Sequence, residues 1–390
     1  MDAVNKKNVA ALSASHGVNT FYLLFITPII PLISAELSLS YFEVGLIASV
    51  FAFANGVFQF PISFLGDYLG KWRTILVTSL MVQSVPVFFY GFAPDFLTLL
   101  FLVFLSGLGC SAYHPPAVSL LTREMPNQRG LSMAYFAGGG EVGSILTPWI
   151  VSTVAVYFSW RVASHLAIFP SIIMATIIFI LFKDSKRNVR PMKQAALSTF
   201  LSLTKNRPLM LLLLVSTFRI TGFRGLMTFL PLLLAQQFNY EVQAIGWILS
   251  IYFIVGIITT FLVGKSSDRG EKTKYILYLT FLCSIAMASI SFVSSSIMIL
   301  FPIFLIGSFL TPVPSLVLAV GTELVDEEKR ASAIGLIYAV NEMGSMISPI
   351  VGGVMAELFN LQFSFLLYAG FFFVASVIAI VLNRMKVELQ

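Results

Sequence analysis

Long apolar stretches, separated by short polar segments, recur along the whole chain. A helix needs roughly 20 apolar residues to cross the hydrocarbon core of a bilayer. The pattern therefore predicts an all-α membrane protein with twelve transmembrane helices, over residues 8–33, 42–65, 74–93, 96–124, 130–157, 162–182, 208–236, 242–264, 275–294, 297–324, 331–357 and 363–382.

The longest polar segment, residues 183–207, divides this pattern into two equal sets of helices. We expect an N-terminal six-helix half over residues 1–182 and a C-terminal six-helix half over residues 208–390. Residues 183–207 are expected to form a linker loop between them. The other loops are too short to hold a soluble domain, so any chemistry must occur at membrane depth.

Composition supports lipid as the main solvent of this chain. Hydrophobic residues make up 57% of the sequence and charged residues only 11%, with a mean hydropathy of +0.90. Soluble domains usually contain about 25% charged residues. The only two cysteines in the sequence, Cys110 and Cys283, lie inside apolar runs. Their number and spacing predict neither a disulfide framework nor a metal site, and we expect no cofactor.

The basic residues indicate how the chain is oriented. All but three of the 24 Lys and Arg residues fall at the chain ends or in loops on one side of the expected helices. The exceptions are Arg161 on the opposite side and Arg219 and Arg224 inside the seventh helix. By the positive-inside rule both termini and the linker are expected to be cytoplasmic, in a multi-pass protein of the cell membrane. The same distribution explains the net charge of +6 without a nucleic-acid partner.

The two halves resemble each other at a nearly constant offset of 201 residues. Charged and helix-breaking residues repeat at this offset, which chance matches between apolar helices would not produce. The corresponding pairs are Gly45 and Gly246, Ser49 and Ser250, Asp67 and Asp268, Lys71 and Lys272, Arg129 and Arg330, Glu141 and Glu342, Gly143 and Gly344, Ser144 and Ser345, and Pro148 and Pro349. Pro31 and Pro231 join this set if one loop residue is gapped. The repeat indicates an internal duplication.

Two loops carry a recognisable motif. Asp67-Tyr68-Leu69-Gly70-Lys71 follows the second helix, and Gly264-xxx-Asp268-Arg269 follows the eighth. Both resemble the Gly-xxx-Asp-Arg-x-Gly-Arg signature of major facilitator transporters. The first copy departs from it at Ser63 and Tyr68, and the second displaces the later glycine to Gly270. The resemblance covers the whole chain and implies the major facilitator fold, in which two six-helix halves alternately open a midplane site to either side.

Four further stretches resemble the fosmidomycin-resistance-type branch of that superfamily. They are His16 with Asn19; Gly107-x-Gly109-xxxx-His114-Pro115; Arg129-Gly130 through Gly138-Gly139-xxx-Gly143; and Arg219 with Gly225-xx-Thr228-Phe229-Leu230-Pro231. Asn19 stands where the family pattern has Asp. The substrate does not transfer with such a resemblance, because one fold serves many functions.

Ionisable residues at bilayer depth are costly and therefore indicate function. His16, His114, Glu141, Arg219 and Glu342 are all expected near the midplane, judged by the helical rise of 1.5 Å per residue. Family geometry, in which helices 1, 4, 7 and 10 line a central cavity, implies that His16, His114 and Arg219 face one aqueous pocket. We predict that the residues that bind the substrate or couple protons are His16, Asn19, His114, Glu141, Arg219, Arg224 and Glu342. Pro28, Pro31, Pro312 and Pro314 are expected to bend helices 1 and 10 around the cavity.

Each of these residues also has a purely structural interpretation. Arg219 cannot be neutralised, so either an anionic substrate or a carboxylate such as Glu141 or Glu342 must balance it. Arg224 would point about 140° away on the same helix and could extend to the outer surface. A buried glutamate could instead be permanently protonated or paired. His114 stands beside Pro115 and Pro116, which interrupt the helix, and His16 could simply bond a neighbouring helix.

The motif loops are expected to act as gates. A carboxylate at a helix end accepts hydrogen bonds from free N–H groups and opposes the positive end of the helix dipole. We assign Asp67, Lys71, Arg73, Asp268 and Arg269 to this gating motif. The alternative is that the two aspartates are ordinary helix caps.

The preferred hypothesis is a secondary transporter that exports a small organic solute in exchange for protons, acting as a monomer in the bilayer. One alternative is a proton-coupled importer of a small organic anion or metabolite. Another is a membrane solute sensor, although no loop could hold a signalling domain. An enzyme is not expected, because the sequence shows neither a nucleophile-base set nor metal ligands.

Overall fold

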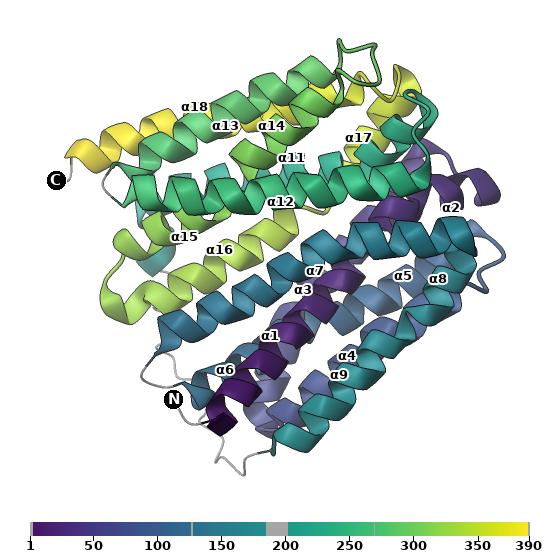
Figure 1. The fold of residues 1–390 in the computed structure, drawn as a ribbon. Coiled ribbons are helices and arrows are strands. Elements are labelled where there is room, and N and C mark those ends of the chain that lie inside the picture. The colour runs from purple at the N-terminus through teal and green to yellow at the C-terminus, as the bar shows by residue number, and fades with distance from the viewer. Residues whose placement is uncertain (1–2, 126–127, 185–201, 269, 389–390) are drawn as a thin grey trace. The chain divides into compact units, whose positions relative to one another are not determined.

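The computed structural model describes residues 3–125, 128–184, 202–268 and 270–388, and the regular structure in this part of the chain is helical throughout. The elements are shown in Figure 1. They are α1 (Ala3–Leu24), η1 (Thr27–Ile29), α2 (Ile30–Leu37), α3 (Tyr41–Leu69), α4 (Trp72–Tyr90), α5 (Phe96–Ser111), α6 (His114–Glu124), α7 (Arg129–Tyr157), α8 (Trp160–Leu166), α9 (Ile168–Leu181), α11 (Arg207–Gln236), α12 (Val242–Ser267), α13 (Lys272–Ile290), α14 (Leu300–Leu310), α15 (Val313–Glu323), η2 (Glu327–Lys329), α16 (Arg330–Gly344), α17 (Ile347–Leu358) and α18 (Ser364–Glu388).

Eleven helical stretches of the described chain are long and apolar enough to cross a membrane. Each falls within one of the expected spans to within several residues at its ends. The remaining expected span is α7, which has 29 residues but contains three consecutive glycines and Glu141. These residues lower its hydropathy without shortening the helix. The predicted all-α fold with twelve spanning segments is therefore confirmed.

The chain folds into two compact units. Unit 1 comprises Met1–Leu39, Val50–Pro191 and Glu241–Ser250, and unit 2 comprises Ser40–Ser49, Met192–Tyr240 and Ile251–Gln390. The helices α3 and α12 each contribute residues to both units. Residues 185–201 of the expected linker lie outside the described residues.

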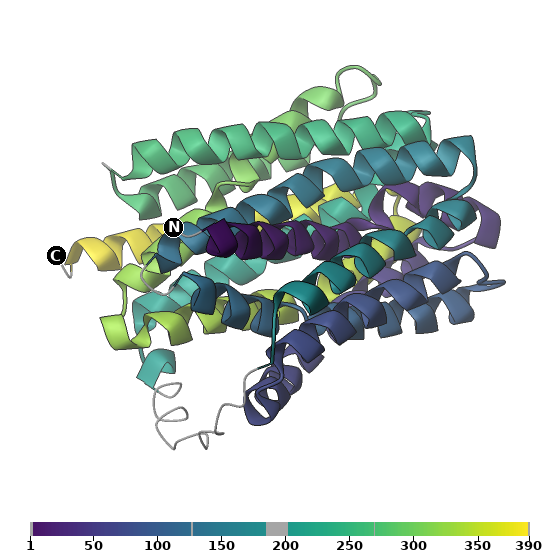
Figure 2. The same ribbon diagram turned by 60° about the horizontal axis from the view of Figure 1, so that its bottom comes forward.

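Unit 1 is built around α1, which lies alongside α7 in both ribbon views (Figures 1 and 2). The two helices approach closely because glycines face each other's backbone. A Cβ atom at Gly139 would lie 1.9 Å from Ser13 O, and one at Gly143 would lie 2.4 Å from Gly17 O. A buried apolar cluster that includes Leu12, Leu120, Phe136 and Ile178 fills the space between α1, α6, α7 and α9.

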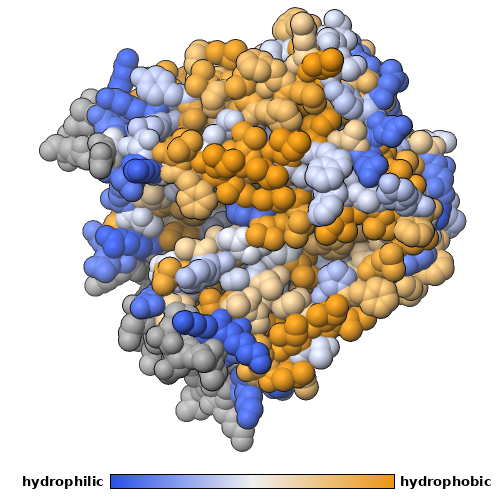
Figure 3. All heavy atoms as spheres, viewed as in Figure 1, coloured by the Kyte–Doolittle hydropathy of each residue, from blue (hydrophilic) through white to orange (hydrophobic). Residues whose placement is uncertain are grey.

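Unit 2 is built around α11 and α18, which pack against each other and against α13 and α16. Its buried cluster includes Leu212, Val317, Ile337 and Leu382. Figure 3 shows hydrophobic side chains along the lengths of the helices and hydrophilic ones gathered toward the helix ends. Large apolar residues on the surface of the protein are strongly exposed, for example Phe261 at 76% and Ile180 at 71%. Lipid is the solvent that such a surface requires.

Several spans are broken, and the breaks position the site. The first span is interrupted by η1, which contains Pro28, so the bend expected there is present. The fourth span is broken between α5 and α6, and the tenth between α14 and α15, beside Pro312 and Pro314. A further break between α16 and α17, at Ser345–Met346, was not predicted from the sequence. Broken helices leave backbone groups that can contact a ligand.

Candidate functional site

The break in the fourth span places His114 at the first position of α6, where Pro115 follows it directly. Proline suits the first turn of a helix because its missing N–H would have no partner there. The preceding residue, Tyr113, is fully buried. The chain therefore presents a tyrosine and a histidine side by side at a helix start within the membrane-spanning segment.

Four rings from three helical segments meet at this break and form what we call the imidazole cluster: His16, Tyr113, His114 and Phe136. The His16 ring stacks on Phe136 with centroids 4.1 Å apart and meets the His114 ring edge-on at 5.3 Å. His16 Nδ1 lies 2.8 Å from the carbonyl oxygen of Phe136. A carbonyl only accepts hydrogen bonds, so Nδ1 carries the hydrogen and Nε2 remains to exchange a proton. The structure thus brings His16 and His114 together, as expected.

The three consecutive glycines of α7 have different surroundings. A Cβ atom at Gly140 would lie 2.7 Å from His16 Cε1, so this glycine makes room for the imidazole. Gly139 faces the backbone of α1, whereas a Cβ at Gly138 would meet nothing within 4 Å. The first glycine is therefore not needed for helix packing.

Glu141 and Asn19 also belong to unit 1. Glu141 is half-buried, and the structure records no hydrogen bond or ion pair for it among the residues it describes. Asn19 is completely buried, and neither of its amide atoms has a hydrogen-bond partner in the described chain. Buried polar atoms are normally satisfied. Unit 1 therefore contains a carboxyl group and an amide group whose hydrogen-bonding atoms are not paired with other described residues.

In unit 2, Arg224 and not Arg219 is the partner of Glu342. The Nη2 atom of Arg224 lies 3.7 Å from Glu342 Oε2, and the two side chains are 21% and 25% exposed. Arg219 is only 5% exposed, and its Nε has no hydrogen-bond partner among the described residues. The sequence analysis considered Glu342 as a partner of Arg219 and expected Arg224 to point about 140° away, so the pairing with Arg224 corrects that interpretation.

The gating motif is described only in part. The side chain of Asp67 and the whole of Arg269 lie outside the described residues, while Lys71 and Asp268 are exposed. Gly70 has a φ of 64°, a left-handed conformation that glycine adopts readily and that explains its place in the motif. Gating by these residues stays a prediction.

Two ion pairs near the same loops were not anticipated. Arg73 lies 3.5 Å from Asp184, and Lys272, the repeat partner of Lys71, lies 2.9 Å from Glu323. Asp184 also accepts hydrogen bonds from the backbone N–H and the hydroxyl of Thr74. The contacts of Asp184 join the first turn of α4 to the chain that follows α9. The repeat offset points to neither pair, because the counterparts of Asp184 and Glu323 are Met385 and Thr122.

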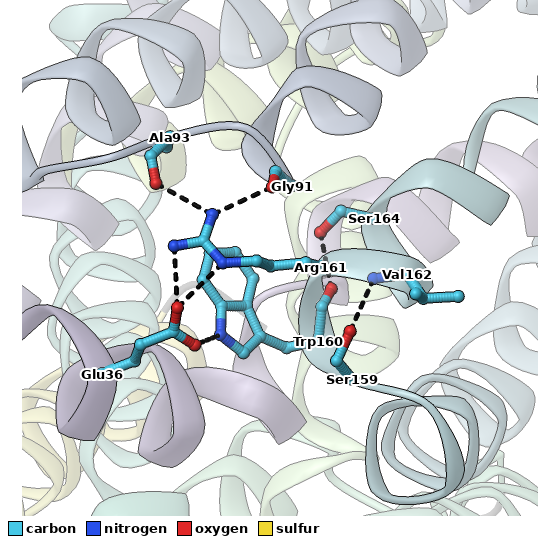
Figure 4. A network of polar contacts seen from close by, with 8 residues as sticks. All are labelled: Glu36, Gly91, Ala93, Ser159, Trp160, Arg161, Val162 and Ser164. Carbon is cyan, nitrogen blue, oxygen red and sulfur yellow. Dashed lines mark hydrogen bonds and ion pairs between the residues drawn. The ribbon is translucent and has the colours of Figure 1, made fainter.

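A polar network at the opposite ends of the unit 1 helices was also missed (Figure 4). Glu36 accepts hydrogen bonds from Trp160 Nε1 at 2.5 Å and from Arg161 Nε at 2.8 Å. Arg161 also donates to the carbonyls of Gly91 and Ala93. His165 lies nearby with Nδ1 3.0 Å from Phe88 O. This network ties the ends of three spans together.

Unit 1 also has an apolar groove of about 530 Å³ between α1, α7, α8 and α9. Its lining includes Val18, Leu146, Ile150 and Leu166 and contains no charged residue. Its threonine, Thr147, donates to Gly143 O within its own helix. The hydroxyl of Ser13, also in the lining, donates to Val9 O within its own helix, so the groove is mainly apolar, unlike the imidazole cluster.

These features define a class of protein: a multi-pass helical membrane protein, duplicated internally, with ionisable side chains and broken helices inside its spans. The family model of the Major Facilitator Superfamily matches residues 12–325 and 212–388. The chain therefore belongs to the Major Facilitator Superfamily, a family of transporters, and the resemblance inferred from its motifs is confirmed.

Individual relatives are distant. The chain is 23% identical over 382 residues to an uncharacterized MFS-type transporter, MJ1560, of Methanocaldococcus jannaschii, covering 96% of this chain and 97% of the other. It is 26% identical over 147 residues to the fosmidomycin resistance protein of Escherichia coli, covering 37% and 36% of the two chains.

The fold matches a crystal structure of a bacterial homolog of the human lysosomal transporter Spinster, in an inward-facing and unoccupied conformation. The TM-score is 0.85 at 17% identity, covering 100% of this chain and 98% of the other. At that identity the likeness establishes the fold and not the solute.

Proposed function

We propose that this protein is a proton-coupled secondary transporter that exports a small organic solute through the cell membrane, with both termini in the cytoplasm. The observation that carries the proposal is the contact between His16 and His114 inside the spanning helices of unit 1. Histidine is the side chain whose charge changes most readily near physiological pH.

The geometry favours a single exchangeable proton on this pair. Two imidazolium ions 5.3 Å apart would repel each other by about 3 kcal/mol at an effective dielectric constant of about 20. The groups that face the pair are Tyr113, which bonds Ser15, and the backbone carbonyl of Phe136. Neither group is negatively charged, so nothing among them would balance the charge that a second proton adds to the two histidines. Glu141 follows Gly140, which faces the His16 ring, and we propose that this carboxyl group exchanges protons with the pair.

Export is favoured over import by the relative named for fosmidomycin resistance, because removal of a compound from the cell is a direct route to resistance. The duplicated fold supports alternation between two orientations. A solute sensor would need an output module, and nothing in the described residues favours that function.

The test uses the purified protein in sealed vesicles with a pH-sensitive dye in the lumen. A panel of small organic solutes, beginning with fosmidomycin, is added outside. We expect at least one solute to drive proton movement in the opposite direction, and an imposed pH gradient to drive its accumulation. Movement of solute and protons in the same direction would instead indicate import. Solute movement without any proton movement would refute the coupling.

The variant His114→Gln identifies the carrier. Solute exchange across the membrane needs only reorientation of the loaded protein, whereas net transport requires the proton to leave. His114→Gln should therefore lose pH-driven accumulation and keep counterflow. The matched control is His165→Gln, which removes the histidine at the outer network and should retain both. If His114→Gln accumulates solute like the parent protein, the imidazole cluster is structural.

A further inference from the structure

Arg219 is a buried cation whose charge nothing in the described chain balances. It is 5% exposed, and no hydrogen bond or ion pair is recorded for it there. The nearby carboxylate Glu342 is paired with Arg224. A guanidinium stays charged in proteins, and an unpaired buried charge is strongly unfavourable. A negatively charged group is therefore missing from its surroundings.

None of the groups recorded around Arg219 carries a negative charge. Arg224 is a second cation, and the others are a tyrosine and a cysteine. Tyr252 and Cys283 lie within electrostatic range of it. The Tyr252 side chain is 1% exposed, and its hydroxyl has no hydrogen-bond partner in the part of the chain that the structure describes. A guanidinium and a phenolic hydroxyl together offer several donors to one acceptor group.

The break in the tenth span lies against the same tyrosine. A Cβ atom at Gly307 would lie 2.8 Å from Tyr252 O, and one at Gly256 would lie 2.2 Å from Thr311 Oγ1. The glycines therefore let α12 approach the end of α14, and Thr311 lies close to Tyr252. Immediately after Thr311 and Pro312, α15 begins at Val313 and runs for 11 residues. The N-terminal end of such a helix is electropositive, which adds to the attraction for an anion.

The fold itself does not require an arginine at this position. At the offset of 200 that aligns Pro31 with Pro231, the counterpart of Arg219 in unit 1 is Asn19, which is also completely buried. The equivalent place in an equivalent bundle is thus occupied by a neutral residue. The charge of Arg219 is a property of unit 2 alone and indicates a ligand that unit 2 alone receives.

We propose that Arg219, Tyr252 and Thr311 form an anion-binding site inside unit 2, which receives a carboxylate, sulfonate or phosphonate group of the transported solute. This inference rests on the proposed function, since it names the chemical class of its solute. The planar fork of the guanidinium suits two oxygens of one such group. An inorganic anion such as chloride has the same charge and is the other source that the experiment must distinguish.

The experiment measures the thermal unfolding midpoint of the purified full-length protein in detergent. The probes are sodium acetate, sodium methanesulfonate and sodium methylphosphonate, each compared with sodium chloride at equal ionic strength and with acetamide. A ligand that binds only the folded state raises its stability. We expect at least one organic anion to raise the midpoint by about 2–4 °C above the chloride sample.

Variants tie the effect to the site. Arg219→Gln should abolish the anion-dependent rise and leave the midpoint without anions unchanged or higher, because it removes an uncompensated charge. Tyr252→Phe should reduce the rise. The matched controls are Arg207→Gln at the exposed start of the same helix and Tyr278→Phe, which is 60% exposed on α13. Both controls should keep the full rise.

Three results would overturn the proposal. The first is an equal midpoint with all anions and acetamide. The second is a rise with chloride that the organic anions neither exceed nor displace, which would make this an inorganic-ion site. The third is a rise that survives Arg219→Gln while the variant itself unfolds earlier, as a structural arginine requires. The measurement uses no gradient, so loss of proton coupling in vesicles would leave this site standing.

Discussion

Gln237 donates a side-chain hydrogen bond to Gln362, and these two residues stand 201 positions after Glu36 and Arg161, the ion pair of unit 1. Gln362 also donates to the carbonyls of Ile290 and Val293 at the end of α13, as Arg161 donates to those of Gly91 and Ala93 after α4. The two units therefore tie equivalent helix ends together with residues at equivalent positions. Unit 1 uses charges and unit 2 uses amides.

This correspondence predicts that a pair of glutamines can replace the Glu36–Arg161 ion pair in unit 1 without loss of stability. The double variant Glu36→Gln/Arg161→Gln should fold like the parent protein, because an amide pair can make the contacts that Gln237 and Gln362 make. Arg161→Ala should be destabilising by about 1–3 kcal/mol, since it leaves carbonyls and a carboxylate without their donor. The thermal unfolding midpoints of the purified variants measure the difference.

The control is Gln362→Ala, which removes the equivalent residue of unit 2 and should resemble Arg161→Ala. Equal loss of stability in the double glutamine variant and in Arg161→Ala would show that the charge of the pair matters and not its hydrogen bonds.

The repeat was visible in the sequence because charged residues recur in it, but it does not extend to every helix break: the eleventh span is broken between α16 and α17, whereas its counterpart α7 is continuous. The spans were predictable for a simple reason: apolar length alone decides whether a helix can cross lipid. The choice of partners was not predictable. Glu342 contacts Arg224 and not Arg219, and no sequence pattern reports how two packed helices are turned toward each other.

The three consecutive glycines of α7 give a prediction with an internal control. Gly139→Ala should be destabilising by about 1–3 kcal/mol or more, because its Cβ would lie 1.9 Å from Ser13 O. Gly138→Ala should be neutral or stabilising by about 0.5–1 kcal/mol, since nothing lies within 4 Å of that position. Thermal unfolding of the two purified variants compares neighbours in one helix. Equal effects would mean that α1 and α7 are not packed as described.

Gly140→Ala should act on function more than on stability. Its Cβ would meet the edge of the His16 ring at 2.7 Å and displace it from Phe136 O. We expect folded protein whose transport rate has a changed pH dependence. Comparison of the pH profiles of Gly140→Ala and Gly138→Ala in vesicles isolates the effect of the ring. Identical pH profiles of the two variants would show that His16 does not take part in proton coupling.

The orientation in the membrane can be tested with engineered thiols. The two native cysteines are both buried, so background labelling by an impermeant maleimide should be low. A cysteine at Ser266, in the last turn of the eighth span, should react only from the cytoplasmic side, and one at Ser294, after the ninth, only from outside. Both positions are exposed. The reverse labelling pattern in sealed cells would refute the orientation inferred from the Lys and Arg distribution.

The last prediction separates the two glutamates of the repeat. Glu342 faces Arg224 at 3.7 Å, whereas the residue 200 positions before Arg224 is Leu24, so Glu141 has no corresponding cation. Loss of one partner from a partly buried ion pair leaves the other charge uncompensated. Glu342→Gln should therefore lower stability, by about 1–3 kcal/mol for a pair this exposed, and Arg224→Gln/Glu342→Gln should recover most of that loss.

Glu141→Gln should behave in the opposite way. It removes no ion pair in the described chain, so the protein should fold normally, but it should lose accumulation driven by a pH gradient while keeping solute counterflow. Measurement of both quantities for each variant, in vesicles and by thermal unfolding, assigns one glutamate to coupling and the other to the integrity of unit 2. If Glu141→Gln accumulates solute at the parent rate and with the parent pH profile, the proton does not travel through this carboxyl group. The imidazole cluster alone would then have to carry it.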